Sequence, residues 1–291
     1  MDRKQLLMYL DLSSHKYGIV IAFAALSLLA FSLITVTQAQ YATALNSHTA
    51  VFHPNIKVKN TNDSLNWAGY AVTGSYGNVT KVTGSFTVPS VSCTKKATTY
   101  AAFWAGLDGY NDSTVEQAGV LVECKRGIPN YSTWTEFYPA PLTTANWKPL
   151  PGDNVNVTVS CTQAGLCTAT VTDGPNSYSN TTTVAGAGLS SAECIAERPE
   201  VGGSLSTLAN FGVAYYGQDY TNIPGTCYAT INGNTIPFGA AGNAIKINMA
   251  DNNTQPIAVT SNLTSDGSSF SVGYAATSGS SPGKHRGGPN K

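Results

Sequence analysis

Charge is scarce in this sequence. Only 11% of its 291 residues are Asp, Glu, Lys or Arg, against about a quarter in an average soluble protein. The 16 acidic and 16 basic residues give a formal net charge of zero, so no basic excess indicates nucleic acid as a partner. Ser, Thr, Asn, Gly and Tyr supply most of the remaining polarity. A surface of neutral polar groups changes little when carboxylates become protonated, which is compatible with an acidic medium.

Histidine is missing from the middle of the chain. The four histidines are His15, His48, His53 and His285, and none lies between residues 64 and 276. Ser-His-Asp and Cys-His mechanisms need an imidazole base, and many zinc sites need imidazole ligands, so both are excluded for this region. The Asp-Thr-Gly and Asp-Ser-Gly signatures of aspartic peptidases and a Gly-rich phosphate loop are also absent. An enzyme in this region has to work with carboxylates and amides.

Long helical patterns are missing as well. After Val36, no stretch of ten or more residues has apolar side chains at the 3.6-residue period of a helix. Short runs of β-forming residues separated by turn residues follow instead, with the clearest alternation from Asn154 to Ser160. About a dozen such runs predict an all-β fold, an antiparallel β-sandwich of two packed sheets that forms one domain over 64–276.

The two ends of the chain differ from this domain. In residues 1–39, basic side chains precede an uncharged apolar run, and small residues fit cleavage after Ala39. The run is also long enough to span a bilayer, so this segment is either a signal peptide or a retained N-terminal membrane anchor. Both alternatives place the remainder outside the cytoplasm, secreted or held at the outer face of the membrane. We expect a linker or short propeptide at 40–63 and a disordered, basic Gly/Ser tail at 277–291.

The cysteines and glycosylation sequons agree with export. An even number of cysteines follows the apolar run, which suits three disulfides. The six are Cys93, Cys124, Cys161, Cys167, Cys194 and Cys227. Cys161 and Cys167 flank a short turn and are the easiest pair to propose, whereas the pairing of the other four stays open. Asn-x-Ser/Thr sequons predict a glycoprotein and begin at Asn62, Asn78, Asn111, Asn130, Asn156, Asn180, Asn252 and Asn262.

Two stretches concentrate candidate functional side chains. Residues 100–139 contain two tryptophans and a group of polar residues, namely Trp104, Asp108, Glu116, Gln117, Glu123, Trp134 and Glu136. Aromatic walls around a few polar groups are typical of a binding cleft, but equally of a sandwich core. In the second stretch, AECIAERP at 192–199, the two-residue period of a strand places Glu193, Ile195 and Glu197 on one face. A lone carboxylate on such a strand is more often a strand-edge charge than a functional group.

Motifs in these stretches resemble the glutamic peptidases, also called eqolisins. NWAGY at 66–70 is similar to the opening of that family's domain, and FTVP at 86–89 to its next strand. FWAGLDG at 103–109 resembles W-x-G-I-D-G, and EQAG at 116–119 resembles L-Q-T-G. WTEFYP at 134–139 is similar to W-Y-E-W-Y-P, and AECIAERP to A-E-x-I-x-E. The family contains acid endopeptidases best known from fungi, and we expect an archaeal or bacterial-type member here.

This resemblance implies a lectin-like, concanavalin A-type sandwich of two bent sheets and a Gln/Glu catalytic pair. Carried over position by position, the pair is Gln117 and Glu197. The supporting and substrate-binding positions are Trp104, Asp108, Trp134, Glu136 and Tyr138. In the implied reaction, the glutamate takes a proton from an attacking water and returns it to the leaving nitrogen, while the glutamine amide stabilises the oxyanion. No metal or cofactor is needed, and we expect a monomer that acts on polypeptides.

Two alternatives remain open. A non-catalytic sandwich could bind glycan or peptide in an aromatic groove without turnover. The second alternative is a glycoside hydrolase of the same architecture. Such enzymes place paired glutamates about four residues apart on one strand, and Glu193 and Glu197 have this spacing. Contact with a membrane is expected only if the N-terminal apolar segment is retained.

Overall fold

The computed structural model describes residues 49–275. The expected signal peptide or anchor and the expected tail at 277–291 therefore lie outside the described residues. Within 49–275 the chain is almost entirely strand, and its only helices are single turns, α2 (Gln218–Thr221) and a 3₁₀ turn (Phe238–Ala241). No helix in this range is long and apolar enough to cross a membrane.

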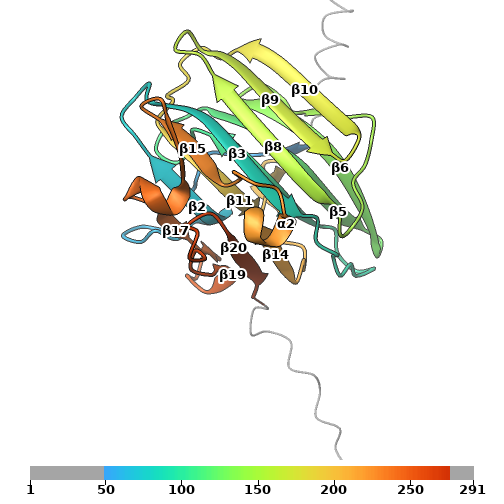
Figure 1. Ribbon diagram of the computed structural model, residues 1–291. Helices are drawn as coiled ribbons and strands as arrows, with labels where there is room; N and C mark the ends of the chain where they lie inside the picture. The colour runs from blue at the N-terminus through green and yellow to red at the C-terminus, as the bar shows by residue number, and fades with distance from the viewer. Residues whose placement is uncertain (1–48, 276–291) are drawn as a thin grey trace, which may run out of the picture. The chain divides into compact units, whose positions relative to one another are not determined.

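One layer of the compact unit that begins at Ala50 is a seven-stranded antiparallel sheet (Figure 1). Its spatial order is β17 (Ile245–Ile247), β2 (Trp67–Thr73), β11 (Ser191–Glu197), β4 (Thr99–Leu107), β5 (Val115–Lys125), β6 (Ile128–Tyr138) and β7 (Thr143–Thr144). β11 lies between β2 and β4, so a strand from late in the chain is inserted among strands from its first half.

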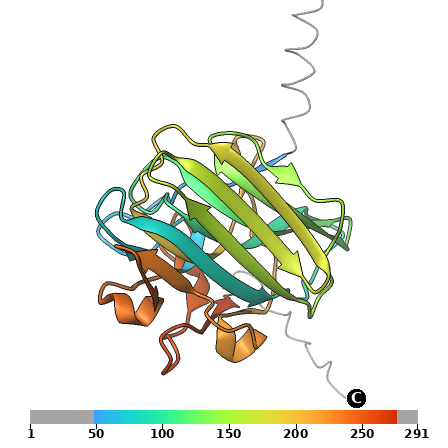
Figure 2. The same ribbon diagram turned by 45° about the horizontal axis from the view of Figure 1, so that its top comes forward.

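The second layer is a ten-stranded sheet, seen in front of β5 and β6 in Figures 1 and 2. Its main order is β10 (Asn176–Thr183), β9 (Leu166–Asp173), β8 (Asn154–Cys161), β3 (Val79–Thr87), β14 (Val213–Tyr216), β20 (Phe270–Tyr274), β19 (Pro256–Thr260) and β18 (Met249–Ala250). β15 (Tyr228–Ile231) also pairs with β3, and β16 (Asn234–Pro237) pairs with β15. A small third sheet contains β1 (Ala50–Val51), β12 (Glu200–Val201) and β13 (Ser204–Leu205). The two large packed sheets confirm the predicted all-β antiparallel sandwich.

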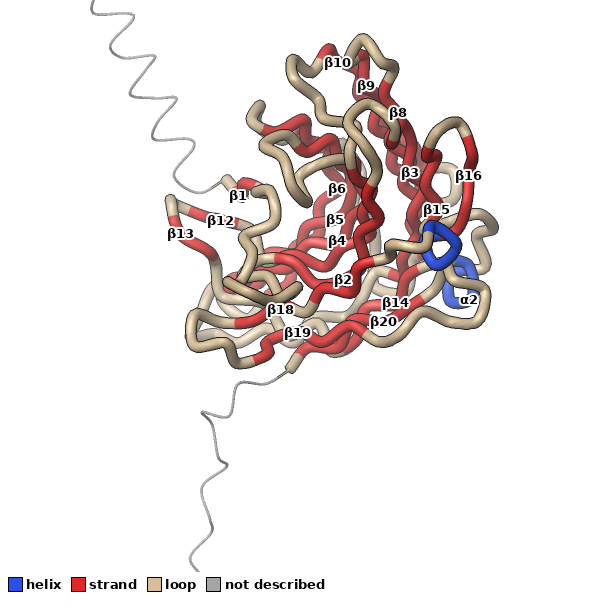
Figure 3. Tube along the Cα trace, turned by 90° about the vertical axis from the view of Figure 1, so that its left-hand side faces the viewer, coloured by secondary structure: helices blue, strands red, loops and turns tan. Residues whose placement is uncertain are grey.

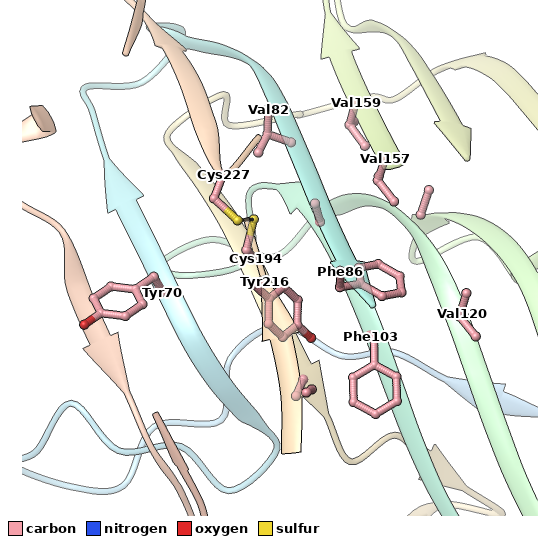
Figure 4. Close-up of a cluster of buried hydrophobic side chains, with 14 of the residues drawn as sticks. Tyr70, Val82, Phe86, Phe103, Val120, Val157, Val159, Cys194, Tyr216 and Cys227 are labelled. Carbon is pink, nitrogen blue, oxygen red and sulfur yellow. Dashed lines mark hydrogen bonds between the residues drawn. The ribbon is translucent and has the colours of Figure 1, made fainter. Parts of the chain in front are cut away.

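The core between the two large sheets explains why β11 is buried on both faces. Cys194 and Ala196 face this core, where Phe103 of β4, Tyr216 of β14 and Phe270 of β20 also pack (Figure 4 shows Phe103, Cys194 and Tyr216). Burying each large apolar side chain stabilises the fold by about 1.5–3 kcal/mol. The Tyr216 hydroxyl donates a 2.7 Å hydrogen bond to the Ile195 carbonyl, which ties β14 directly to β11.

The cysteines form two disulfides, Cys93–Cys124 and Cys161–Cys167. The second closes the β8–β9 hairpin at directly paired positions, as the sequence predicts. The expected third disulfide is not formed, since Cys194 and Cys227 are free thiols. Their sulfurs are nevertheless 2.7 Å apart in the core between the sheets (Figure 4).

Residues 50–63, expected to belong to a linker or short propeptide, pack against the sandwich. β1 pairs with β12, and Lys57 forms a bridge to Ser64 at the start of the main domain. The first part of this segment, residues 50–55, is named the strap below. Figure 3 shows β1 and β12 on the side of the seven-stranded sheet away from β8, β9 and β10.

Candidate active site

Three successive rows on one face of the seven-stranded sheet carry most of the predicted site residues. Paired residues of antiparallel strands project to the same side, so each row follows from the strand register. The first row is Glu193, Gly106, Gln117 and Glu136, the second is Ile195, Trp104, Gly119 and Trp134, and the third contains Glu197. Four different strands therefore bring the predicted catalytic and aromatic side chains to the face that lies away from the inter-sheet core.

Gln117 and Glu136 are directly paired neighbours on β5 and β6. The Gln117 amide nitrogen donates a 2.8 Å hydrogen bond to Oε2 of Glu136. Both side chains are buried, and neither Oε1 atom has a hydrogen-bond partner of normal geometry among the described residues. Glu136 thus fixes the orientation of the Gln117 amide and leaves its carbonyl oxygen and second N–H for another group.

Glu197 ends β11 and is fully buried. Its Oε2 accepts a 2.9 Å hydrogen bond from the Trp104 indole. Its Oε1 accepts longer bonds, 3.3 Å from the His53 backbone N–H and 3.4 Å from the Asn66 amide. Three N–H donors around one carboxyl group hold it in a fixed position and stabilise its ionised form.

The surroundings nevertheless raise the pKa of Glu197 well above its ordinary value. Burial is the main cause, and repulsion from Glu136 adds to it, while the hydrogen bonds from Trp104, His53 and Asn66 oppose the rise. Burial likewise raises the pKa of Glu136, against hydrogen bonds from Gln117 and the Phe52 backbone. The charge of Glu136 therefore couples to Glu197 while its carboxyl group also contacts Gln117, so Glu136 links the two predicted catalytic residues.

Aromatic rings form the walls around these groups. Trp67 meets Trp104 edge to face, with ring centroids 5.0 Å apart, and Trp134 stacks on Phe52 of the strap at 4.0 Å. Gly119 lies between Trp104 and Trp134 in the second row. A side chain at Gly119 would begin 2.1 Å from the Phe103 carbonyl oxygen and 2.6 Å from Cβ of Trp104, so only glycine lets β5 lie this close to β4. The tryptophans are thus both core residues and walls of the candidate site.

Asp108 belongs to a different group of carboxyls. It is buried and accepts 2.7 Å hydrogen bonds from the backbone N–H groups of Leu189 and Ser190, which anchor the loop before β11. Its charge raises the pKa of Asp112, Glu116 and Glu193, in addition to the larger effect of burial. We name Asp108, Asp112, Glu116 and Glu193 the acid cluster.

Glu193 belongs to the acid cluster, whereas Glu197 does not. Burial raises the pKa of Glu193, and repulsion from Asp108, Asp112 and Glu116 adds to it, whereas Glu136 is the carboxylate that affects Glu197. Ile195 lies between the two glutamates on the same face, as the two-residue period predicts. The glutamate pair that a glycoside hydrolase would use is therefore divided between two environments.

Sequence reasoning missed four residues that contact the site. Asn66 and Trp67 lie in NWAGY, which the family resemblance includes, but that motif assigns them no role. Phe52 and His53 lie in the strap, upstream of the expected domain limit, and their unpatterned surroundings gave no signal. His53 contacts Tyr138 edge to face at 5.2 Å, and Tyr138 is half-buried at the rim. A histidine therefore lies beside the site although the expected domain contains none.

Comparisons with known proteins identify relatives of this chain. Aspergillopepsin-2 of Aspergillus niger is 32% identical over 179 residues, which are 51% of this chain and 61% of that protein. The match thus spans less than two-thirds of that relative. The crystal structure of aspergilloglutamic peptidase from Aspergillus niger superposes with a TM-score of 0.53 at 27% identity, over 61% of this chain and 99% of that one.

A second solved structure shares the fold. Scytalido-glutamic peptidase, crystallised with a transition state analog inhibitor, superposes with a TM-score of 0.60 at 21% identity. The superposition covers 72% of this chain and 98% of that one. A model of the peptidase A4 family matches residues 65–274, which include every predicted site residue. The chain therefore belongs to the peptidase A4 family.

Proposed function

We propose that this protein is a secreted acid endopeptidase in which Gln117 and Glu197 act together on a water molecule. The observation that carries the proposal is the setting of Glu197, a buried carboxyl group held by indole, amide and backbone N–H donors. It lies on the same sheet face as the Gln117–Glu136 pair, in a chain of the peptidase A4 family. Two disulfides agree with folding in an oxidising compartment.

The reaction follows from the donors and acceptors of the site. Ionised Glu197 removes a proton from water while the water oxygen bonds to the peptide carbonyl carbon. The carbonyl oxygen gains the electron pair, and the Gln117 N–H that does not bind Glu136 donates to this oxyanion. The C–N bond then breaks as the protonated Glu197 gives its proton to the leaving nitrogen. The Gln117 carbonyl, which has no partner, is an acceptor for the attacking water.

The relatives give this proposal its substrate class. Scytalido-glutamic peptidase has been crystallised with a peptide-based transition state analog, and SCP-B of the eqolisin family with the tripeptide Ala-Ile-His. Those two structures share only the fold with this chain at 20–22% identity. The named organism among these relatives is Aspergillus niger, so an archaeal or bacterial type stays a prediction.

Cleavage of an unfolded protein tests the proposal. We expect turnover between about pH 2 and pH 4 and resistance to pepstatin. Burial raises the pKa of Glu197 in the closed site, so its ionisation at this pH requires water to enter the site while the N–H donors of Trp104 and Asn66 hold the carboxylate. Glu197→Gln and Gln117→Ala should each abolish most of it. Glu123→Gln is the matched control, because Glu123 lies on β5 but pairs with Tyr100, away from the catalytic residues. Full activity of both site variants would refute the assignment, and peptide binding without turnover at any pH would favour the non-catalytic alternative.

A further inference from the structure

A buried hydroxyl group lies behind the donors that hold Glu197. Ser64 has no exposed surface. Its backbone is fixed beside β18 of the ten-stranded sheet, because its N–H donates to the Asn248 carbonyl at 2.9 Å and its carbonyl accepts from the Ala250 N–H at 2.8 Å. Ser64 therefore occupies a fixed position two residues before Asn66, whose amide contacts Glu197.

The contacts of Ser64 decide where its hydroxyl hydrogen points. The Ser64 oxygen accepts hydrogen bonds from the backbone N–H groups of Asn66 at 3.2 Å and of Trp67 at 3.0 Å. A hydroxyl group has a single hydrogen to donate. The nearer acceptor for that hydrogen is Oδ1 of Asn66 at 2.9 Å, whereas the Ile56 carbonyl lies 3.4 Å away. The hydrogen is thus directed to the side-chain carbonyl of Asn66.

This bond sets the orientation of the Asn66 amide. Its Oδ1 accepts from the Ser64 hydroxyl and, at 2.8 Å, from the Ile56 backbone N–H, so its NH₂ group points the other way. The NH₂ group donates to Glu197 Oε1 at 3.4 Å and to two carbonyls of the strap at 3.2 Å each. An inverted amide would place an oxygen against these three acceptors. The Ser64 hydroxyl therefore keeps a donor, rather than an acceptor, beside Glu197.

Ser64 also has a second contact that could act on the site by packing. Trp67, whose backbone N–H binds the Ser64 oxygen, meets Trp104 edge to face with ring centroids 5.0 Å apart. The Trp104 indole donates to Glu197 Oε2. The route through Asn66 is a chain of hydrogen bonds, whereas the route through Trp67 is a contact between rings, so experiments can separate the two.

The charged groups around Glu197 do not take part in this chain of bonds. Glu136 on β6 is the carboxylate whose charge acts on Glu197. In the strap, Nε2 of His53 lies 3.2 Å from a carboxylate oxygen of Glu200 on β12. Arg198, the next residue along the chain, donates from its guanidinium group to a backbone carbonyl at 2.7 Å. A change confined to the Ser64 hydroxyl leaves all of these charges in place.

We propose that Ser64 is a positioning residue, whose hydroxyl group holds the Asn66 amide with its N–H toward Glu197 and so favours the ionised base. The role in catalysis rests on the proposed peptidase function, but the ionisation of Glu197 is measurable without turnover. The hydrogen bond from Asn66 lowers the pKa of Glu197. Its loss should therefore raise that pKa and move the acidic limb of the kcat/KM profile to higher pH.

Ser64→Ala tests the proposal through the pH profile. We expect kcat/KM on the acidic limb to fall about three- to tenfold, as the loss of one hydrogen bond predicts, mainly through kcat. Ser64→Thr keeps the hydroxyl group and should restore the limb. The matched control is Ser85→Ala, because Ser85 is also a buried serine but binds the hydroxyls of Thr221 and Thr226. That variant should leave the limb in place.

A second control concerns glycosylation. Ser64 is the hydroxyl residue of the sequon that begins at Asn62, so Ser64→Ala removes this sequon as well. Asn62→Gln removes the sequon and keeps the Ser64 hydroxyl, and its acidic limb should match that of the parent. A limb that moves equally in Asn62→Gln and Ser64→Ala would assign the effect to the sequon and overturn the proposal.

A double-mutant cycle separates the amide from the packing. If Ser64 acts through Asn66, Asn66→Ala should move the limb at least as far as Ser64→Ala does, and the double variant should move it no further. Additive shifts would mean that Ser64 acts through Trp67, which would overturn the role given to the amide. A loss of kcat/KM that is uniform across pH would show a structural role only.

Carbon NMR of the glutamate carboxyl groups follows the ionisation itself. The resonance that is missing in Glu197→Gln identifies Glu197, and its titration midpoint should be higher in Ser64→Ala than in the parent. Equal midpoints would overturn the proposal. A shifted midpoint in a protein without proteolysis at any pH would keep Ser64 as the group that orients Asn66 and refute the peptidase function instead.

A variant of similar size covers the case in which Ser64→Ala does not fold, as judged by circular dichroism. Ser64→Cys keeps a side chain of the same shape, but its thiol is a weak donor and a weak acceptor. The acidic limb and the carbon titration midpoint should both move to higher pH in this variant. Parent-like values of both in Ser64→Cys would reject the proposal.

Discussion

The seven-stranded sheet carries two groups of buried carboxyls, and they are built differently. In the catalytic group, the carboxyl groups of Glu136 and Glu197 receive N–H donors from Gln117, Trp104 and Asn66. In the acid cluster, neither oxygen of Glu116 or Glu193 has a hydrogen-bond partner of normal geometry among the described residues. Donors stabilise a carboxylate, whereas a cluster of neighbouring acids without donors stabilises the protonated form. The first group can change its charge during a reaction, whereas Glu116 and Glu193 of the acid cluster stay protonated beside the charge of Asp108.

Burial acts on both groups, so the difference lies in the neighbours. Burial and the charges of Asp108 and Asp112 raise the pKa of Glu116 to about 10. Burial is also the main cause of the raised pKa of Glu197, but there three hydrogen bonds oppose it. The strap contacts Glu197 directly through the His53 N–H, so displacement of the strap would reduce the desolvation of Glu197. We therefore expect the catalytic group to govern activity and the acid cluster to govern stability.

The largest expected effect is a difference in activity loss between variants of two glutamates of β11. Glu197→Gln keeps the shape of the side chain but removes the base, and we expect kcat to fall by about 10²–10⁴-fold. Glu193→Gln replaces a protonated carboxyl group by a neutral amide of equal size, so activity at acidic pH should change less than threefold. Steady-state kinetics on one unfolded protein substrate measures both. Equal losses in the two variants would show that Glu193 is catalytic, as a glycoside hydrolase-type pair would require.

The acid cluster should make the protein less stable as pH rises. The pKa of Glu116 is about 10 in the folded protein, against an ordinary value of 4.5. Between these two pH values the folded state therefore holds a proton that the unfolded state has released. Its contribution is complete below pH 4.5 and is lost as pH rises toward 10. For one such group, the free energy of unfolding falls by about 3 kcal/mol between pH 4.5 and pH 7.

Denaturant titrations at several pH values check this loss. Glu116→Gln with Glu193→Gln should flatten the decline, while the other two cluster members, Asp108 and Asp112, and the neighbouring Tyr110 remain. Glu136 and Glu197 contribute a decline of the same sign, because their pKa values are raised as well. Stability that stays constant from pH 4 to pH 8 in the parent protein would contradict the neutral form of the cluster.

The sequence predicted the fold and the sheet face better than it predicted the contacts. Alternation within AECIAE correctly separated Ile195 from Cys194 and Ala196, because strand geometry depends only on local order. The motifs predicted that Gln117, Trp104, Trp134 and Glu136 surround one cleft, and the strand register brings these four residues to one sheet face. The link from Gln117 to Glu136 could not be read this way, because it depends on which strands pair and in what register.

The strap shows why the other contacts of the site could not be predicted from the sequence. Residues 50–55 have neither periodicity nor a motif, so a polar, irregular segment was expected to be a linker or a short propeptide. Its position is set by single contacts, such as Phe52 on Trp134 and the His53 carbonyl on Trp67, with partners distant in sequence. The same holds for Asp108, whose carboxylate anchors backbone N–H groups of a loop eighty residues later. Contacts of this kind carry no local pattern.

A smaller effect should distinguish the indoles of the site. Trp104→Phe removes the donor to Glu197 Oε2, and because that bond lowers the pKa of Glu197, its loss should move the acidic limb of the kcat/KM profile to higher pH. The charge-assisted bond corresponds to about 1.5–3 kcal/mol, so kcat/KM on that limb should fall about tenfold or more. Trp134→Phe is the matched control, since its indole nitrogen has no partner, and it should leave the limb in place. A shift in both variants would mean that ring packing, not the N–H donor, sets the titration.

The smallest effect tests the link through Glu136. Glu136→Gln removes the charge that raises the pKa of Glu197, so the acidic limb should move to lower pH, opposite to Trp104→Phe. The new side chain keeps an oxygen that can accept the Gln117 bond, which limits the loss of kcat to a few-fold. Glu136→Ala removes both the charge and the acceptor, and should lower kcat further through a misoriented Gln117. If the two variants behave alike, Glu136 acts on Glu197 by its charge only. If Glu136→Gln leaves the pH profile of kcat/KM unchanged, the Gln117–Glu136 pair and Glu197 titrate independently and do not form one linked site.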